Sequence, residues 1–199
     1  MAGSTTDKRL SADEAAAALA GLNAAPRLIA VDGLPLSGKS TLAGSLADRF
    51  GWAVLEFDDF YLPAEDWPPS IEPAFPFPFF RLDEFRAAVR SLHEQGECSW
   101  RPIDWPTLTV QPEPRHIGRG QPVIVEGCSV LDPALADLYD FRLFVESDRS
   151  TLAAAQKARD GVNVLSELWA KLFLPSVDIY MRTRPDERAD LVVAGRGSP

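Results

Sequence analysis

One segment of eight residues, from Gly33 to Ser40, constrains the fold of this chain more than any other part of the sequence. Its letters, GLPLSGKS, satisfy the pattern G-x-x-x-x-G-K-[ST]. Four specified positions of this kind recur by chance in roughly one chain in a hundred or fewer. The segment follows a largely apolar run of strand length at 27–32 and precedes apolar residues at helical spacing over 39–50. A strand, a glycine-rich turn and a helix in this order predict a phosphate-binding loop.

Such a loop binds a nucleotide mainly through its backbone. Glycines permit a tight turn in which successive N–H groups face one concavity, and the helix that follows adds its positive N-terminal end. We expect Lys39 to reach the β- and γ-phosphates of ATP and the Ser40 hydroxyl to bind Mg²⁺. The predicted nucleotide-binding residues are Gly33, Leu34, Pro35, Leu36, Ser37, Gly38, Lys39, Ser40 and Thr41.

Further apolar runs of strand length alternate with helical patterns along the chain. We expect strands at 53–57, 122–126, 141–145 and 190–194, and helices at 39–50, 82–92, 149–159 and 164–182. Pro175 should start, kink or break the last of these helices. The alternation predicts an α/β fold, the three-layer sandwich of P-loop NTPases, with a mostly parallel five-stranded sheet and helices on both faces.

We interpret residues 1–199 as a single domain with two additions. Residues 1–26 form an N-terminal extension, in which 1–10 resemble a frayed end and 11–21 a short helix with Ser11 as its cap and Glu14 three residues on. Residues 61–120 form an insertion for the acceptor site, because prolines and phenylalanines crowd the stretch 62–80 and β-formers mix with prolines over 99–119. The second part suggests a small hairpin or lid.

Composition narrows the classes of partner. A net charge of −9 argues against nucleic acid or an anionic membrane as the main partner, since both require a basic surface. Two cysteines provide no disulfide framework, and the alanine-rich stretch at 14–25 is too short for a membrane span and lacks a basic leader. We therefore expect a cytoplasmic protein that binds ATP and a small molecule. Whether it forms a homodimer stays open.

Two adjacent carboxylates, Asp58 and Asp59, follow the second predicted strand. In an open α/β sheet this edge faces the ligand crevice, where a carboxylate can accept a proton from an attacking hydroxyl group. An isolated Asp-Asp pair more often forms a turn in which both side chains bond the backbone. The neighbouring sequence decides between these interpretations.

That sequence resembles the uridine kinase-like branch of P-loop kinases, which includes phosphoribulokinase and pantothenate kinase. The resemblance covers residues 27–197, and its motifs occur in the order found in that branch. Besides the phosphate loop they are Asp-Asp-Phe-Tyr at 58–61, Ile-Asp-Trp at 103–105, Val-Glu-Gly at 125–127, Arg-Asp at 159–160 and Ala-Asp-Leu-Val-Val-Ala-Gly at 189–195.

The resemblance implies roles for single residues. Asp58 matches the catalytic base, and Tyr61 matches a residue that lines the acceptor site. Asp104 falls where a motif of the family approaches the substrate, and Trp105 beside it would join the aromatic run at 75–80 in an apolar acceptor pocket. Those aromatic residues could equally form core beneath a proline-rich loop.

Two further residues would act on the phosphates. Glu126 follows a buried strand, as a carboxylate that holds Mg²⁺ through water would, although a strand-end surface acid is the alternative. Arg159 matches a lid arginine that neutralises charge on the transferred phosphoryl group, although an arginine alone is more often a solvated helix residue. With Lys39 and Asp58 it completes the expected catalytic set.

The sequence also departs from the family. Nucleoside kinases of this branch hold the ribose hydroxyls with an acidic residue after a His-Pro pair, whereas here 77–81 reads Phe-Pro-Phe-Phe-Arg. The lid stretch 152–157 carries alanines and a glutamine where basic residues are usual. We expect a kinase that transfers the γ-phosphoryl group of ATP to a hydroxyl of a small metabolite. The alternatives are a regulatory ATPase without an acceptor and a nucleoside monophosphate kinase.

Overall fold

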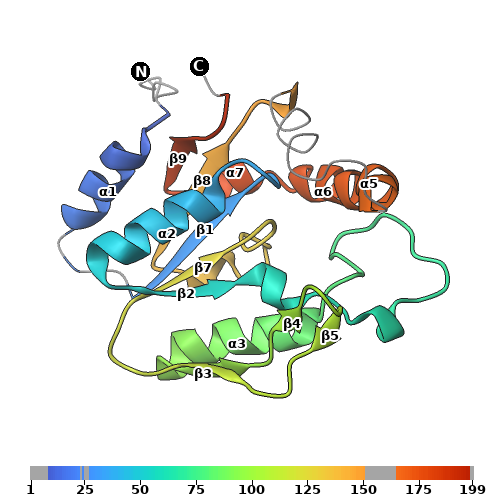
Figure 1. The fold of residues 1–199 in the computed structure, drawn as a ribbon. Coiled ribbons are helices and arrows are strands. Elements are labelled where there is room, and N and C mark those ends of the chain that lie inside the picture. Colours follow the sequence, from blue (N-terminus) through green and yellow to red (C-terminus); the bar gives the residue numbers. More distant parts are fainter. Residues whose placement is uncertain (1–8, 23, 25–26, 151–164, 198–199) are drawn as a thin grey trace.

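The computed structural model describes residues 9–22, 24, 27–150 and 165–197. Its centre is a parallel sheet of five strands in the order β2-β7-β1-β8-β9 (Figure 1). The strands are β1 (Leu28–Gly33), β2 (Ala53–Glu56), β7 (Val123–Glu126), β8 (Phe141–Glu146) and β9 (Leu191–Ala194). All five expected strands are present, and the sheet is parallel throughout.

Helices cover both faces of this sheet, as expected. Strand β1 alternates between the two sides, because Ile29 and Val31 pack with α1 (Ala12–Ala20) and α2 (Lys39–Phe50). Leu28 and Ala30 point to the other side, where α3 (Leu82–Gln95) and α6 (Leu174–Met181) lie. Every residue of β1 is buried. The continuous apolar run in the sequence therefore reflects a strand between two helical layers.

The N-terminal extension is more ordered at its end than the sequence suggests. Ser11 caps α1 by accepting a hydrogen bond from the Glu14 amide at 3.2 Å, and the Glu14 carboxylate returns to the Ser11 amide. The expectation of a frayed end is wrong for residues 9 and 10, because Leu10 pairs with Val193 of β9 in a parallel bridge. Two backbone hydrogen bonds satisfy the outer edge of β9 there.

The C-terminal helical region changes its winding before Pro175. Helix α5 (Leu165–Leu168) passes into a π-helical turn, Trp169–Phe173, and then into α6. Pro175 is in the first turn of α6, and the backbone is already right-handed helical at Phe173 and Leu174 before it. The proline does not break the helical run, and the change of winding falls directly before it. A short helix, α7 (Pro185–Arg188), precedes β9.

The segment 61–120, expected from the sequence to be an insertion, has only short elements around α3. It begins after a 3₁₀ turn, η1 (Phe57–Phe60), and contains a second one, η2 (Ala64–Asp66). Two small hairpins follow α3: β3 (Cys98–Trp100) pairs with β6 (Arg115–Ile117), and β4 (Ile103–Asp104) pairs with β5 (Thr109–Val110). A third 3₁₀ turn, η3 (Ala136–Leu138), lies before β8.

The aromatic run at 75–80 is mainly core. Phe77, Phe79 and Phe80 are at most 8% exposed and pack in the cluster beneath α3 and α6. Core under a proline-rich loop, the commoner fate of phenylalanine, therefore accounts for most of the run. Within the described residues, no helix has the length and apolarity needed to cross a membrane.

Candidate active site

The predicted phosphate loop joins β1 to α2 at the carboxyl end of the sheet. Leu36 has a φ of 64° and Gly38, the N-cap of α2, a φ of 102°, so the backbone enters the left-handed region twice within three residues. Backbone segments that alternate between right- and left-handed conformations form concave sites for anions. The N-terminus of the twelve-residue helix α2 begins directly after this turn. The local geometry is that of an anion-binding loop.

The last strand holds the loop in place. The Ser37 carbonyl accepts hydrogen bonds from the Arg196 amide at 2.9 Å and from Ser147 Oγ at 3.1 Å. This requires close contact at Gly195, where an added Cβ would lie 2.3 Å from Ser147 Oγ and 2.6 Å from the Ser37 carbonyl oxygen. The glycine that ends the motif at 189–195 therefore lets the backbone after β9 reach the phosphate loop.

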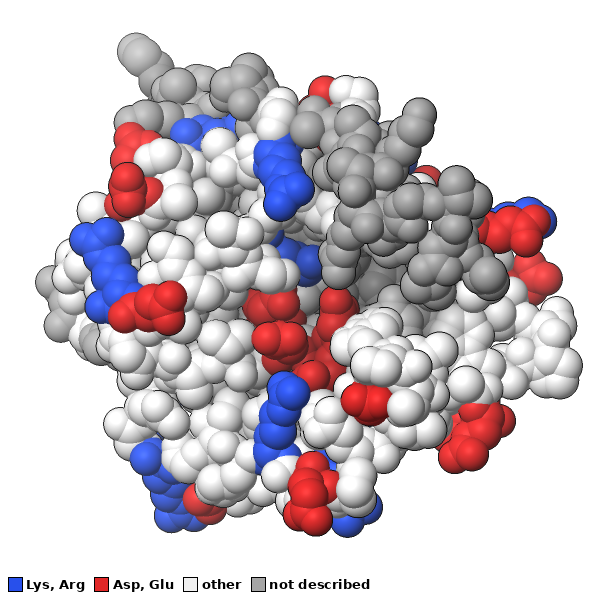
Figure 2. Space-filling view, in the orientation of Figure 1, with Lys and Arg blue, Asp and Glu red and all other residues white. Residues whose placement is uncertain are grey.

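Lys39 lies at the centre of a group of charges. Its side chain is buried, and burial alone would lower its pKa. The nearby acidic groups, of which Asp58 and Glu126 have the largest effects, act more strongly in sum, so the pKa of Lys39 is raised and the ammonium stays protonated. Figure 2 shows acidic side chains gathered beside a basic one at the hollowed centre of this face. A cation fixed among carboxylates at this loop suits the binding of a triphosphate.

Ser40 and Glu126, both expected from the sequence to hold Mg²⁺, contact each other. Ser40 Oγ lies 3.2 Å from Oε1 and 3.3 Å from Oε2 of Glu126, although the two residues are 86 positions apart. Glu126 is 5% exposed, so it is not the strand-end surface acid considered as the alternative. Burial raises its pKa to about 7, with the charges of Asp58 and Glu56 adding to the effect and Lys39 opposing it.

These two residues offer the ligands that Mg²⁺ prefers. A hydroxyl and a carboxylate are hard oxygen donors, and protein-bound Mg²⁺ commonly takes its other ligands from phosphate oxygens and water. Among the described residues, no group of three or more His, Cys, Asp or Glu side chains could hold a metal ion by itself. The pair Ser40 and Glu126 therefore fits a magnesium ion that arrives with a nucleotide.

The two adjacent aspartates differ in burial and in their hydrogen-bond partners. Asp59 is buried and accepts hydrogen bonds from Trp100 Nε1 at 2.7 Å and from the Arg115 guanidinium at 3.0 Å. Asp58 is exposed, and its carboxylate has no hydrogen-bond partner among the described residues. The turn interpretation, with both side chains bonded to the backbone, is wrong. Of the two carboxylates, that of Asp58 is the one without a hydrogen-bond partner in the described ranges, and its charge acts on Lys39 and Glu126.

Of the residues predicted to bind the acceptor, Tyr61 lies near enough to Asp58 to respond to its charge, and Trp105 packs against Tyr61. Tyr61 is half-buried, and its ring stacks at a tilt on Phe80 with centroids 4.1 Å apart. Trp105 contacts the Tyr61 ring edge-on at 4.9 Å and is 49% exposed. Burial, with the charge of Asp58, holds the pKa of the Tyr61 hydroxyl well above its usual value, so the hydroxyl keeps its proton. Tyr61 and Trp105 form the exposed edge of the aromatic core.

Asp104 has a local partner. Its carboxylate accepts hydrogen bonds from the amide and the hydroxyl of Thr107, and its carbonyl accepts one from the Leu108 amide. The residue therefore closes the turn between β4 and β5 that presents Trp105. In this conformation Asp104 shapes the hairpin that carries Trp105 against Tyr61.

Sequence reasoning did not single out Asp32, which is fully buried just before the phosphate loop. Its carboxylate accepts hydrogen bonds from Tyr180 and from the backbone amides of Gly33, Ser129 and Leu131. Burial raises its pKa, while these hydrogen bonds act in the opposite direction. Asp32 ties the end of β1 to the loop after β7 and to α6. The only sequence signal was a charged residue closing an apolar run.

Arg159 and the lid stretch at 152–157 lie outside the described residues. The other predicted site residues are described and come from separate elements: the phosphate loop, η1, the β4–β5 hairpin and β7. Lys39, Ser40, Asp58 and Glu126 are brought together at the carboxyl end of the sheet.

Comparison with solved structures places the fold. A candidate uridine kinase from Bacillus stearothermophilus superposes with a TM-score of 0.72 at 19% identity, covering 92% of this chain and 96% of the other. A candidate fructose transport system kinase from Silicibacter sp. TM1040 gives a TM-score of 0.66 at 22% identity, covering 92% and 97%. D-glycerate 3-kinase from Cryptococcus neoformans gives 0.50 at 15% identity, covering 85% and 84%.

No protein-family model matches the sequence, and no curated protein sequence matches it. The structural similarity nevertheless confirms the α/β fold and, at the level of the fold, the resemblance to the uridine kinase-like branch of P-loop kinases.

Proposed function

We propose that this chain is a kinase that transfers the γ-phosphoryl group of Mg-ATP to a hydroxyl group of a small metabolite. One observation carries the proposal. Lys39 and Ser40 at the start of α2 lie with Glu126 and Asp58, whose carboxylate has no hydrogen-bond partner in the described part of the chain, at one edge of a parallel sheet. Phosphate-binding, metal-binding and proton-accepting groups are thereby combined where ligands of open α/β sheets bind.

The loop from Gly33 to Thr41 would hold the nucleotide. Its backbone amides would bind phosphate oxygens, and Lys39 would bind the β- and γ-phosphates. Ser40 and Glu126 would hold Mg²⁺ directly or through water, and the ion would offset negative charge on the phosphates when bound. The two side chains are already in contact, so little rearrangement is needed to assemble this part of the site.

Asp58 would act on the acceptor. Its carboxylate would accept the proton of the acceptor hydroxyl, whose oxygen forms the new bond to the γ-phosphorus. The bond from the γ-phosphorus to the oxygen that bridges the β- and γ-phosphates breaks, and ADP leaves with that oxygen. Lys39 would stabilise the negative charge that develops there. Arg159, proposed to close over the transferred group, would add a second positive charge.

The acceptor would lie beside Asp58, Tyr61 and Trp105. The exposed aromatic edge suits the apolar face of a sugar or the ring of a nucleoside, and the neutral Tyr61 hydroxyl can donate a hydrogen bond to it. Three structural neighbours are named for uridine, fructose and D-glycerate. A hydroxyl group is common to all three compounds, which makes them the first acceptors to test.

The proposal is tested by ADP release from Mg-ATP with uridine, D-fructose, D-glycerate or a wider panel of hydroxyl compounds. We expect one compound to raise the rate well above the rate without acceptor and to appear as a phosphate ester by mass spectrometry. Lys39→Ala should abolish both signals. Slow ADP release that no compound stimulates would instead indicate a regulatory ATPase. Stimulation by a nucleoside monophosphate, with a diphosphate as product, would indicate the third alternative.

A further inference from the structure

Arg81 is the N-cap residue of helix α3, and its side chain makes four polar contacts, none of them with the predicted phosphate loop. We infer that Arg81 is a positioning residue that fixes the acceptor side of the site by joining the turn that carries Asp58 to the hairpin that carries Trp105. The inference rests on the proposed function for the role of Asp58, while the joining itself is a property of the fold.

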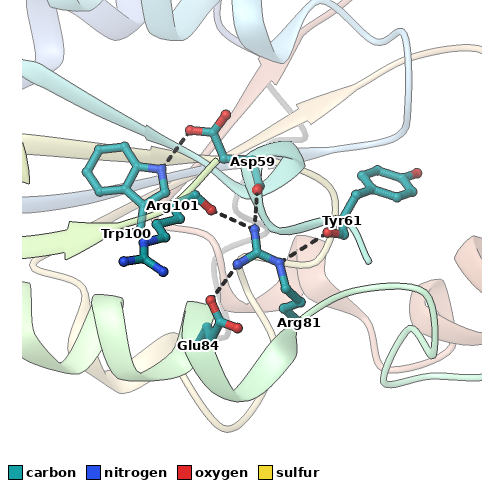
Figure 3. Close-up of polar contacts among 6 residues, drawn as sticks. All are labelled: Asp59, Tyr61, Arg81, Glu84, Trp100 and Arg101. Atoms are coloured by element: carbon teal, nitrogen blue, oxygen red, sulfur yellow. Dashed lines mark hydrogen bonds and ion pairs between the residues drawn. The ribbon is translucent and has the colours of Figure 1, made fainter. Parts of the chain in front are cut away.

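The contacts of Arg81 go to main-chain carbonyl groups of two separate segments. Nε donates to the Tyr61 carbonyl at 3.2 Å, and one terminal nitrogen donates to the Asp59 carbonyl at 2.8 Å. The same nitrogen donates to the Arg101 carbonyl at 2.7 Å. Figure 3 shows the guanidinium between these three groups, with the Tyr61 ring directed away from it.

These bonds hold the segment that directly follows Asp58. The held carbonyl groups belong to Asp59, the next residue, and to Tyr61, three residues on. The Arg81 amide also donates to the Phe60 carbonyl at 2.7 Å, and the guanidinium lies 5.6 Å from the centre of the Phe60 ring. Arg81 therefore contacts all three residues that directly follow the proposed base.

The third carbonyl belongs to the opposite wall of the acceptor site. Arg101 lies just before β4, and the β4–β5 hairpin presents Trp105 against Tyr61. Main chain and side chains of the two segments thus point in different directions. Their carbonyl groups point to Arg81, while the Tyr61 and Trp105 side chains face the proposed acceptor. Only a planar group with several N–H donors in fixed directions can bridge three carbonyl groups in this way.

Burial makes the arrangement specific. The Arg81 side chain is 8% exposed, and Glu84, which forms an ion pair with it, is 57% exposed. A buried guanidinium needs its donors satisfied, and here the carbonyl groups satisfy most of them. The ion pair with Glu84 is the outer contact, so it can be removed without opening the two inner segments. Glu84→Gln therefore provides a matched control for changes at Arg81.

The test compares Arg81→Lys with Glu84→Gln by amide hydrogen exchange, read by mass spectrometry. Lysine keeps the charge but cannot span three carbonyl groups. We expect Arg81→Lys to exchange faster in peptides covering 57–62 and 101–110 together, by tenfold or more, with unchanged exchange in 28–46. Glu84→Gln should match the wild type in all three regions.

Unchanged exchange in either of the first two regions would overturn the inference. Faster exchange throughout the sheet would also overturn it, because Arg81 would then stabilise the fold in general. If Arg81→Lys does not fold, Arg81→Gln gives the same comparison, since it retains one side-chain N–H group for a carbonyl. The exchange result stands whether or not an acceptor has been found.

Turnover then links the arrangement to catalysis. Displacement of a catalytic group by about 1 Å can reduce a rate by about 100-fold. With the panel compound that the wild type phosphorylates, we expect Arg81→Lys to lower kcat about 10- to 100-fold and to leave the KM for Mg-ATP unchanged. Wild-type kcat with altered exchange would refute the positioning role. If the wild type is inactive with every panel compound, the result counts against the proposed function. The role of Arg81 in joining the two segments is then decided by the exchange data alone.

Discussion

The two adjacent aspartates allow catalysis and stability to be tested separately. Asp58→Asn removes the proposed base without changing the size of the side chain. Loss of a general base typically lowers turnover about 10²- to 10⁴-fold. The Asp58 carboxylate has no hydrogen-bond partner among the described residues and is exposed, so the free energy of unfolding should change by no more than about 0.5 kcal/mol. Binding of Mg-ATP should be preserved.

Asp59 should show the opposite pattern. Asp59→Ala leaves the buried Trp100 indole N–H without an acceptor, at a cost of about 1–3 kcal/mol. The pair with Arg115 adds little, because the Arg115 side chain is 52% exposed and such pairs contribute about 0–1 kcal/mol. A loss of about 1–3 kcal/mol in a chain of this size lowers Tm by roughly 2–12 °C. Asp59→Asn retains an acceptor for Trp100 and should keep turnover within a few-fold of the wild type.

The assay is acceptor-dependent ADP release for all three variants, with Tm from thermal unfolding and Mg-ATP affinity from calorimetry. Wild-type turnover in Asp58→Asn would remove Asp58 from the mechanism. Equal losses of turnover in Asp58→Asn and Asp59→Asn would contradict the division of roles that the hydrogen bonds indicate.

Three further results are expected. Mg-ATP at about 100 times its Kd should stabilise the wild type by about 2.7 kcal/mol and raise its Tm by roughly 5–10 °C. Lys39→Ala should lose this shift in Tm. An equal shift in the variant would contradict the assigned phosphate loop. Gly195→Ala should cost about 1–3 kcal/mol in thermal unfolding, since its Cβ would meet Ser147 Oγ at 2.3 Å, whereas Gly44→Ala, with nothing within 4 Å, should be neutral or stabilising. Equal Tm values for the two would refute this. Burial raises the pKa of Cys98 to about 11 from 9.0. At pH 8 its thiolate fraction, and therefore its rate of alkylation by iodoacetamide, should be about 100-fold below that of an unfolded control. Reaction at the rate of the unfolded control would show that the thiol is accessible.

Much of the fold could be predicted from local sequence patterns. Strands buried on both faces leave continuous apolar runs, and all five were found within one or two residues of their ends. The cap of α1 also follows local rules, because Ser11 and Glu14 are neighbours on one helical turn. The contact between Ser40 and Glu126 could be anticipated because the strand order of the fold brings both to one edge of the sheet.

What escaped prediction depends on contacts between distant residues. Nothing local distinguishes Asp58 from Asp59, since the difference comes from Trp100 and Arg115 on a hairpin about 40 to 60 positions later. Arg81 gave no signal for the same reason, because its partners are carbonyl groups, which every residue has. The sequence predicts a frayed end at residues 9 and 10 because the single bridge between Leu10 and β9 leaves no periodic pattern of apolar residues in the sequence.

The most direct test of the kinase assignment is a crystal structure with Mg²⁺, a non-hydrolysable ATP analogue and an acceptor that stimulates ADP release. The account predicts the β- and γ-phosphates in the loop from Gly33 to Thr41, with the metal ion beside Ser40 and Glu126. It also predicts the acceptor hydroxyl within hydrogen-bond distance of the Asp58 carboxylate. A triphosphate bound elsewhere, or an acceptor hydroxyl that does not reach Asp58, would contradict it.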